Sequence, residues 1–386
     1  MVLPNYKDSS IVNLMSSIGS VYSHKSIYEE LKILKSNELK KYKNIVLVVV
    51  DGLGYEFIQK YGKGSFLYNN IRDKITSVFP SATSCAMTAF STGDSTQQHA
   101  LVGWYTYFKE IAMLSIPLPY VTMQSWISLS ESGVDIDKIM NFSSFNSKIK
   151  NVEKITITRD DLADSDFTNK TLLPSKIISY KSLNGFFKEI QSNISIGKKK
   201  KYVLAYWPKL DVLEHEFGPD SKEVKEHFFQ LDKKFESLFK KLNDDTLVIV
   251  TADHGLIGSP KNRRVDLNKH SKLKECLSMP LSGDGRVKYC YVKLSKKDEF
   301  ENYILKNLDH VCEMHKSEDL IKKNYFGLGK ENSKLRDRVG DYTLIMKDNY
   351  LFNGSLLDKK THFEVGNHGG TSEEEMFVPL ILLKKK

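Results

Sequence analysis

Aspartate and histidine side chains recur at the ends of the most strand-like runs in this sequence. They fall in four places along the chain: Asp51, Asp211 with His215, Asp253 with His254, and His368. The runs NIVLVVV, YVLAYW and TLVIVT precede the first three groups, and VPLILL follows the fourth. Ligands of open α/β sheets bind beyond the carboxyl ends of the strands, so we expect these side chains to converge on one edge.

Carboxylate oxygens and imidazole nitrogens are suitable ligands for zinc, and also for manganese or iron. The side chains in the four groups are too many for one zinc ion, and they divide into two sets of three that each leave a position open. Two divalent ions roughly 4 Å apart can hold the attacking and the leaving oxygen of a phosphoryl transfer. The pattern therefore predicts two divalent metal ions, with Zn²⁺ preferred and Mn²⁺ as the second choice.

Taken singly, the groups also have structural interpretations. Asp51 could cap the turn after its strand, because Asp-Gly is a common turn pair. Asp211 and His215 are four residues apart, and such a pair on a helix is often only a surface contact. His368 alone would pass for an ordinary loop histidine. The metal interpretation rests on all four groups together.

A hydroxyl-rich stretch, FPSATSCAMTAFSTG at residues 79–93, leads into an apolar helical pattern. Thr83 or Ser81 could be only the N-cap of this helix. A hydroxyl at a helix N-terminus is also well placed for phosphate chemistry, because free backbone N–H groups and the helix dipole favour an anion. A bound metal ion would lower the pKa of the hydroxyl, so Thr83 is the candidate nucleophile and a candidate metal ligand.

Strands that alternate with helical patterns predict an α/β sandwich around a mostly parallel sheet. The expected strands are 44–50, 202–207, 246–251 and 378–383, with a helix over 221–242. Residues 256–350 interrupt the alternation with short strands, a helix near 298–308 and many charges. We expect a catalytic core of residues 1–255 and 351–386, with 256–350 as an inserted lid subdomain. A second insertion is expected over about 105–195.

Length and composition place few limits on function. The 386 residues are 40% hydrophobic, which is enough for a substantial core. The net charge of +9 comes mostly from lysine, and the basic runs are too short to favour a nucleic-acid duplex as partner. No apolar stretch reaches the roughly 18 residues of a membrane span, and the N-terminus lacks a signal-peptide pattern. A cytoplasmic location is therefore expected, and the oligomeric state is left open.

The cysteines and the other histidines are assigned no chemistry. The four cysteines form no CxxC pair, which predicts free thiols in a reducing compartment. The histidines given structural roles are His24, His99, His227, His270, His310, His315 and His362.

The order of the short motifs resembles the nucleotide pyrophosphatase/phosphodiesterase branch of the alkaline phosphatase superfamily. VDG, FPSAT, DxxxHxxGP, TADHG and NHGG follow one another at predicted strand ends or helix starts. The resemblance covers about residues 44–104 and 202–256 and the stretch after about 360. It implies an alkaline phosphatase-like sandwich, with helices on both faces of the sheet and a small inserted α+β lid.

The resemblance also implies a role for each motif residue. Thr83 would be the nucleophile, would bridge to the metals and would carry the phosphoryl group as a covalent intermediate. The implied ligand sets are Asp211, His215 and His368 for one ion, and Asp51, Asp253 and His254 for the other.

Two positions depart from the family's pattern. In the segment 99–104, Ala100 takes the place of the glycine in an H-G-[IL] turn. Ala86 stands where nucleotide-cleaving members carry an asparagine that donates to a phosphoryl oxygen. That donor would have to come from Ser84, a backbone N–H or the insertion. Arg286 in the insertion could contact phosphate, although a surface position is the simpler expectation.

The expected function is metal-dependent hydrolysis of phosphodiester or pyrophosphate bonds in a small anionic substrate, with nucleotides among the candidates. The alternative keeps the two-metal core and changes the substrate to a phosphomonoester, a phosphonate or a sulfate ester. A non-catalytic binding protein on this scaffold is disfavoured, because neither the nucleophile nor any ligand is missing.

Overall fold

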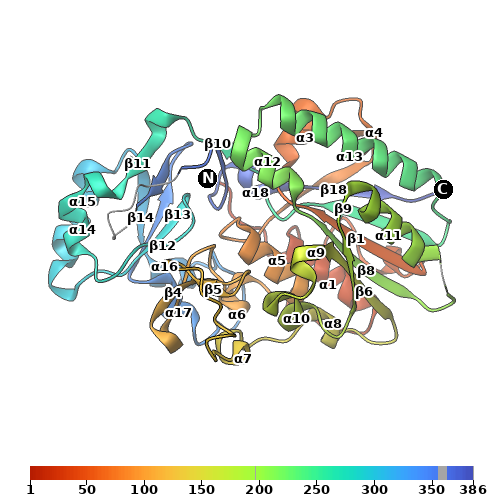
Figure 1. The fold of residues 1–386 in the computed structure, drawn as a ribbon, viewed down its shortest axis with the longest axis horizontal. Helices are drawn as coiled ribbons and strands as arrows, with labels where there is room; N and C mark the ends of the chain where they lie inside the picture. The colour runs from red at the N-terminus through yellow and green to blue at the C-terminus, as the bar shows by residue number, and fades with distance from the viewer. Residues whose placement is uncertain (196, 355–362, 386) are drawn as a thin grey trace.

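A seven-stranded sheet forms the centre of the computed structural model, which describes residues 1–195, 197–354 and 363–385 (Figure 1). Its strand order is β2-β18-β9-β1-β8-β6-β7. The strands are β1 (Asn44–Val50), β2 (Ile71–Thr76), β6 (Glu153–Arg159), β7 (Lys176–Tyr180), β8 (Lys201–Trp207), β9 (Thr246–Thr251) and β18 (Phe377–Leu383). The expected mostly parallel sheet is confirmed, because only β18 runs antiparallel to its neighbours, β9 and β2.

The innermost strand shows why these residues form the sheet. All seven residues of β1 are buried and most are β-branched, as expected for a strand covered on both faces. Its parallel pairing sets Val50 beside Trp207 of β8, and Val49 beside Thr251 of β9. The three strands therefore end at the same level, on the same edge of the sheet.

Helices cover both faces of this sheet, as Figure 1 shows for α3 and α13 on one side and α1 and α5 on the other. The main helices are α1 (Ile11–Val21), α3 (Tyr55–Tyr61), α5 (Thr83–Thr92), α11 (Leu183–Ser195), α12 (Lys209–Phe217) and α13 (Lys222–Lys240). The prediction of a helix over 221–242 was nearly correct, with Ser221 as the N-cap. None of the described helices combines the length and the apolar character needed to cross a membrane.

The predicted second insertion over 105–195 was partly wrong. Residues 153–180 supply β6 and β7, which belong to the central sheet, and α11 packs against both strands. Only the earlier part lies outside, as a small sheet of β3 (Thr106–Phe108), β4 (Met113–Ile116) and β5 (Val121–Thr122). The sequence was misleading here because β7 is an edge strand, with two half-buried and two exposed residues.

A separate four-stranded sheet lies within residues 256–350, with strand order β12-β13-β15-β14. Its elements are β12 (Ser282–Gly283), β13 (Val287–Cys290), β14 (Cys312–Lys316) and β15 (Tyr342–Met346), with α14 (Ser271–Cys276) and α15 (Lys297–Asn307) beside it. Cys290, Leu344 and Phe300 belong to a hydrophobic cluster of its own. Val287 and Tyr289 point the other way, into a cluster that includes Phe79 from the core.

A buried ion pair joins this sheet to the core. Arg286 and Glu375 are 1% and 0% exposed, and Nε and a terminal nitrogen of the arginine each donate to one carboxylate oxygen at 3.0 Å. The remaining terminal nitrogen donates to the carbonyl of Tyr350, and Asp348 accepts another bond. The expected surface position of Arg286 was therefore wrong, and its donors are used within the protein.

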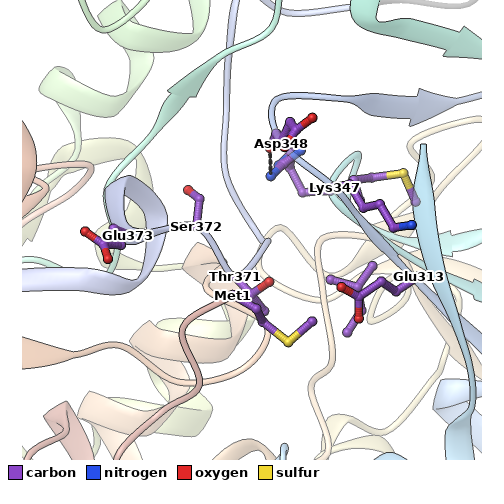
Figure 2. A pocket seen from close by; sticks show the side chains of 10 residues that line it. Met1, Glu313, Lys347, Asp348, Thr371, Ser372 and Glu373 are labelled. Carbon is purple, nitrogen blue, oxygen red and sulfur yellow. Dashed lines mark hydrogen bonds between the residues drawn. The ribbon is translucent and has the colours of Figure 1, made fainter. Parts of the chain in front are cut away.

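The same carboxylate holds the loop that leads into the last strand. Glu375 lies in α18 (Glu373–Met376) and accepts bonds from the backbone N–H groups of Gly370, at 2.8 Å, and Ser372, at 3.3 Å. A cavity of about 400 Å³ lies beside the pair, lined among others by Met1, Glu313 and Lys347 (Figure 2). Neither Thr83 nor any of the predicted metal ligands is among the described residues that line it.

We predict that Glu375→Ala lowers the free energy of unfolding by about 3–5 kcal/mol, because Arg286 is left buried without its counter-charge. The matched control is Glu374→Ala, an exposed neighbour on the same helix that should change stability by less than about 0.5 kcal/mol. Urea unfolding of both variants measures the difference. Equal unfolding midpoints for the two variants would contradict the role given to the pair.

Candidate metal centre

The four predicted groups meet at the carboxyl edge of the central strands. Asp51 directly follows β1, Asp253 lies two residues beyond β9, and Asp211 lies in α12, which begins just after β8. His368 follows β17 (Gly366–Asn367), which pairs with β10 (Ile257–Gly258) beyond β9. Among the described residues, two groups of side chains are close enough to hold a metal ion: Asp211, His215 and His368, and Asp51, Asp211 and His254.

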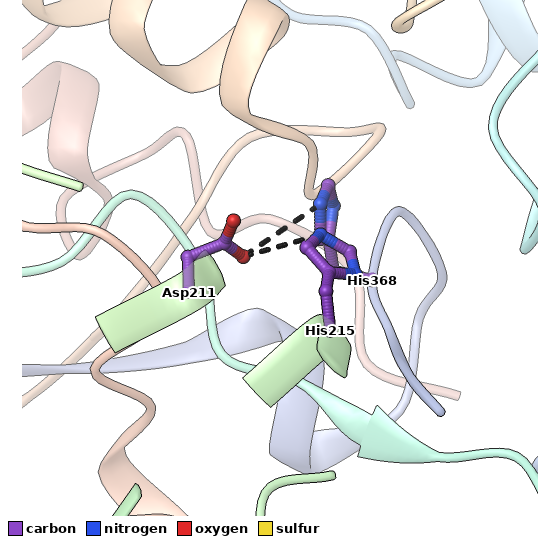
Figure 3. A group of neighbouring side chains, drawn as sticks. All are labelled: Asp211, His215 and His368. Carbon is purple, nitrogen blue, oxygen red and sulfur yellow. Dashed lines mark ion pairs between the residues drawn. The ribbon is translucent and has the colours of Figure 1, made fainter. Parts of the chain in front are cut away.

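The first group gathers around one oxygen of Asp211 (Figure 3). Oδ1 of Asp211 is 3.4 Å from Nε2 of His215 and 4.0 Å from Nε2 of His368. The segment of Asp211 and His215 is helical, so the two residues lie one turn apart on the same face of α12. This arrangement offers three ligand atoms from two separate segments.

The second group gathers around Nε2 of His254. This nitrogen is 3.5 Å from Oδ1 of Asp51, 3.3 Å from Oδ2 of Asp253 and 3.0 Å from Oγ1 of Thr83. The other oxygen of Asp253 accepts bonds from the backbone N–H groups of Gly52, at 3.2 Å, and His254, at 3.0 Å. The loops after β1 and β9 are thus tied together where their ligands converge.

Thr83 is the first residue of α5, and the alternative capping role was wrong. The N-cap is Ala82, and no side chain caps this helix. Ser81, the other candidate cap, instead donates its hydroxyl proton to the carbonyl of Gly370 at 2.8 Å. The Thr83 hydroxyl is therefore not used at the helix terminus and faces His254.

The donor atoms present fit divalent cations. Oδ1 of Asp51, Oδ1 of Asp211 and Oδ2 of Asp253 are buried and have no hydrogen-bond partner among the described residues. A buried carboxylate oxygen without a partner is costly unless a cation lies beside it. The atoms of Asp51 and Asp211 belong to the two groups above, and Oδ2 of Asp253 lies 3.3 Å from Nε2 of His254, so bound metal ions would satisfy all three.

The electrostatics of the site lead to the same conclusion. Burial raises the pKa of Asp211 to about 8 and that of Asp253 to about 7, and it raises the pKa of Asp51 well above its ordinary value. Burial also lowers the pKa of His254 to about 3, which keeps this imidazole neutral. A divalent ion would reverse the penalty on the carboxylates, and neutral imidazole is the form that binds metal.

Hydrogen bonds fix the orientation of two of the imidazoles. Nδ1 of His254 faces the carbonyl of Gly255 at 3.2 Å and Nδ1 of His215 faces that of Gly366 at 2.8 Å, which leaves Nε2 of each ring for a metal. Burial alone would lower the pKa of His215, but Asp211 and Glu364 raise it to about 10. The rings of His254 and His368 stack with centroids 3.8 Å apart.

Three residues near the centre were missed by the sequence analysis. Tyr206 donates its hydroxyl proton to Oδ2 of Asp51, Glu364 contacts His215, and Glu214 is fully buried with neither carboxylate oxygen in a hydrogen bond among the described residues. Glu214 lies inside the DVLEH motif and Tyr206 inside the YVLAYW strand, so their proximity could have been noticed. Glu364 carries no signal, because it precedes its motif in an irregular stretch.

The other histidines stay structural where they are described. His227 accepts a bond from the Trp207 indole at 3.0 Å, and His270 faces the Tyr303 hydroxyl at 2.9 Å. His362 lies outside the described residues. Ala100 adopts the left-handed conformation with φ of 55°, which explains why a glycine would suit this position. All four cysteines are buried and free.

A family model and several solved structures match this chain. The family model described as type I phosphodiesterase / nucleotide pyrophosphatase matches residues 45–371. The solved structure of murine ectonucleotide pyrophosphatase / phosphodiesterase 5 is 19% identical, with a TM-score of 0.66 over 87% of each chain. Phosphonoacetate hydrolase from Sinorhizobium meliloti 1021, in complex with phosphonoformate, is 15% identical, with a TM-score of 0.60 over 88% of this chain and 89% of that chain. Both likenesses confirm the fold.

A curated relative is much longer than this chain. GPI ethanolamine phosphate transferase 3 of Schizosaccharomyces pombe is 23% identical over 224 residues, which is 56% of this chain and 23% of that protein. The chain thus spans about a quarter of this relative's length.

We predict that protein purified without chelators contains about two equivalents of divalent metal, because the two ligand groups need separate ions. Elemental analysis measures the stoichiometry, and EDTA should remove both the metal and the phospho-esterase activity. The exposed His310→Ala variant should keep the full metal content. Metal content near zero, with activity insensitive to EDTA, would contradict the two-ion site.

We also predict that the metal-free protein loses stability as the pH rises from about 6.5 to about 8. The folded carboxyl of Asp253 holds its proton up to a pKa of about 7 and that of Asp211 up to a pKa of about 8, whereas the unfolded carboxyls have already lost theirs. Each group contributes a loss of up to about 1.4 kcal/mol per pH unit below its folded pKa, and this slope fades above that pKa. Urea unfolding at several pH values should show this decrease in the free energy of unfolding for the metal-free protein, and a smaller decrease for the zinc-bound protein. A metal-free stability that is level or rising would contradict the assignment.

Proposed function

This chain belongs to the type I phosphodiesterase / nucleotide pyrophosphatase family, and we propose that it hydrolyses phosphodiester or pyrophosphate bonds with the help of two zinc ions. Manganese is the alternative metal. The observation that carries the proposal is the position of Thr83, whose Oγ1 lies 3.0 Å from Nε2 of His254. A hydroxyl that faces the metal ligands at the start of a helix is placed to attack phosphorus.

The first proposed ligand set is the first group of side chains, so that Asp211, His215 and His368 would hold one ion. Asp51, Asp253 and His254 would hold the other: Asp253 takes the place of Asp211 in the second group, because its Oδ2 lies 3.3 Å from Nε2 of His254. Bound ions supply Lewis-acid stabilisation of the phosphoryl oxygens and favour the ionised threonine hydroxyl. Tyr206 orients Asp51 through the hydrogen bond to its outer oxygen, so that Oδ1 faces the site.

Thr83 acts as the nucleophile in this proposal. Its oxygen forms a bond to phosphorus, and the bond from phosphorus to the leaving oxygen breaks, so the leaving alcohol or phosphate takes the electron pair. Water then attacks the phospho-threonine, which releases the phosphoryl group and restores the Thr83 hydroxyl. Both steps develop negative charge on the phosphoryl oxygens.

Backbone donors at the start of α5 can stabilise that charge in place of the absent asparagine. The N–H groups of Cys85 and Ala86 donate to the carbonyl of Ala82. Within the described part of the chain, the N–H groups of Thr83 and Ser84 have no acceptor. They lie at the positive end of a helix that contains the nucleophile, where an anion is favoured.

The second candidate function is hydrolysis of a phosphomonoester, a phosphonate or a sulfate ester. It is favoured by Ala86, a fully buried methyl at the position of the family's amide donor. Rates on bis-p-nitrophenyl phosphate, p-nitrophenyl phosphate, p-nitrophenyl sulfate and phosphonoacetate separate the candidates. A preference of at least tenfold for the diester supports the first function, and a preference for any other substrate replaces it with the second.

We predict that Thr83→Ala lowers kcat by several orders of magnitude while metal content and melting temperature change little, because Ala82 and not Thr83 occupies the N-cap. Thr83→Ser should retain a measurable fraction of kcat, since its primary hydroxyl can still attack.

The matched control for Thr83 is Thr92→Ala, which removes a buried hydroxyl of the same helix that donates to the carbonyl of Thr88. This variant should keep nearly normal kcat. Near-normal turnover in Thr83→Ala would remove the nucleophile from the proposal even with both ions bound.

A further inference from the structure

His215 differs from His254 and His368 in the contacts of its Nδ1 atom, the ring nitrogen that faces away from the proposed metal. Its Nδ1 lies 2.8 Å from Oε2 of Glu364 and 2.8 Å from the carbonyl oxygen of Gly366. Nδ1 of His254 faces only a carbonyl, and Nδ1 of His368 has no hydrogen-bond partner among the described residues. Among the described residues, a carboxylate thus faces the Nδ1 atom of one imidazole of the three.

We propose that Glu364 is a positioning residue, which fixes the ring of His215 with Nε2 directed at the metal and strengthens the binding of that one ion. The proposal rests on the metal centre of the proposed function. A carboxylate that accepts the Nδ1 proton of a ligating histidine selects the tautomer, holds the ring in place and makes the imidazole a better donor. Nε2 of His215 already faces Oδ1 of Asp211 at 3.4 Å.

The backbone around Glu364 is tied to the helix of His215. The N–H of Val365 donates to the carbonyl of His215 at 2.9 Å, and the Arg264 guanidinium and the Asn367 amide each donate to the carbonyl of Glu364 at 3.1 Å. A Cβ at Gly366 would lie 2.3 Å from the carbonyl oxygen of Glu214, so only glycine allows this close approach. Glu364 is therefore held against the ligand by its main chain, although its side chain is 44% exposed.

This arrangement makes the two ions unequal. The ion at Asp211, His215 and His368 depends on a carboxylate outside its ligand set, whereas the other ion has no such contact through its histidine. Removal of Glu364 should weaken one ion and spare the other.

The experiment titrates zinc into metal-stripped full-length protein in competition with a chromophoric chelator, which resolves the two dissociation constants. Glu364→Ala should weaken one ion about 10- to 100-fold and change the other less than about twofold. Glu364→Gln keeps an acceptor without the charge and should lie between. The control Glu226→Ala removes an exposed glutamate of α13 and should match the wild type.

A double-mutant cycle assigns the effect to His215. In the His215→Ala background, Glu364→Ala should cause no further loss of zinc affinity, because its contact is gone. If Glu364→Ala binds two ions with unchanged affinities, the inference is overturned and the proposed function stands. Equal weakening of both ions would also overturn the inference, because it would show a general charge effect. A wild-type protein that binds no zinc would overturn the proposed function and the inference together.

Discussion

The hydrogen-bond register of β9, β1 and β8 is the constraint from which the site follows. The strands are parallel neighbours, and Val50 pairs with Trp207 while Val49 pairs with Thr251, so all three chains leave the sheet at one level. Asp51, Asp211 and Asp253 follow these strand ends within a few residues. A slip of one residue would turn every side chain of a strand to the opposite face of the sheet and disrupt the packing on both faces, so the carboxylates cannot separate without repacking the core.

That constraint concentrates negative charge where the fold tolerates it least. Asp51, Asp211, Asp253 and Glu214 are all buried, and burial raises the pKa of each carboxyl above its ordinary value. A Cβ at Gly52 would lie 2.4 Å from Oε2 of Glu214, so the loop after β1 packs directly on this acid. A site built only for stability would not gather such groups, and their common need is a cation.

The sequence was most informative where chemistry and strand ends coincide. β1 and β9 were predicted with their observed bounds, because continuous β-branched runs leave little choice. β6 and β7 were assigned to an insertion, since their charged and polar residues interrupt any continuous apolar run. The contacts of Arg286 and Glu364 could not be predicted for another reason. Arg286 pairs with Glu375, and Glu364 contacts His215, and in each case the partner lies far along the chain. Such pairs depend on tertiary packing, which no local sequence pattern encodes.

The loop of residues 364–372 connects the metal centre to the second sheet. It supplies His368 and Glu364 on one side, while Gly370 and Ser372 are held by Glu375 on the other. Glu375 is in turn paired with Arg286 from the turn between β12 and β13. The central sheet alone positions Asp51 and Asp253, whereas the position of His368 also depends on this loop. The second sheet would therefore influence the proposed ion at Asp211, His215 and His368 more directly than the proposed ion at Asp51, Asp253 and His254. Differences in the inserted segment would change the binding of the first ion before that of the second.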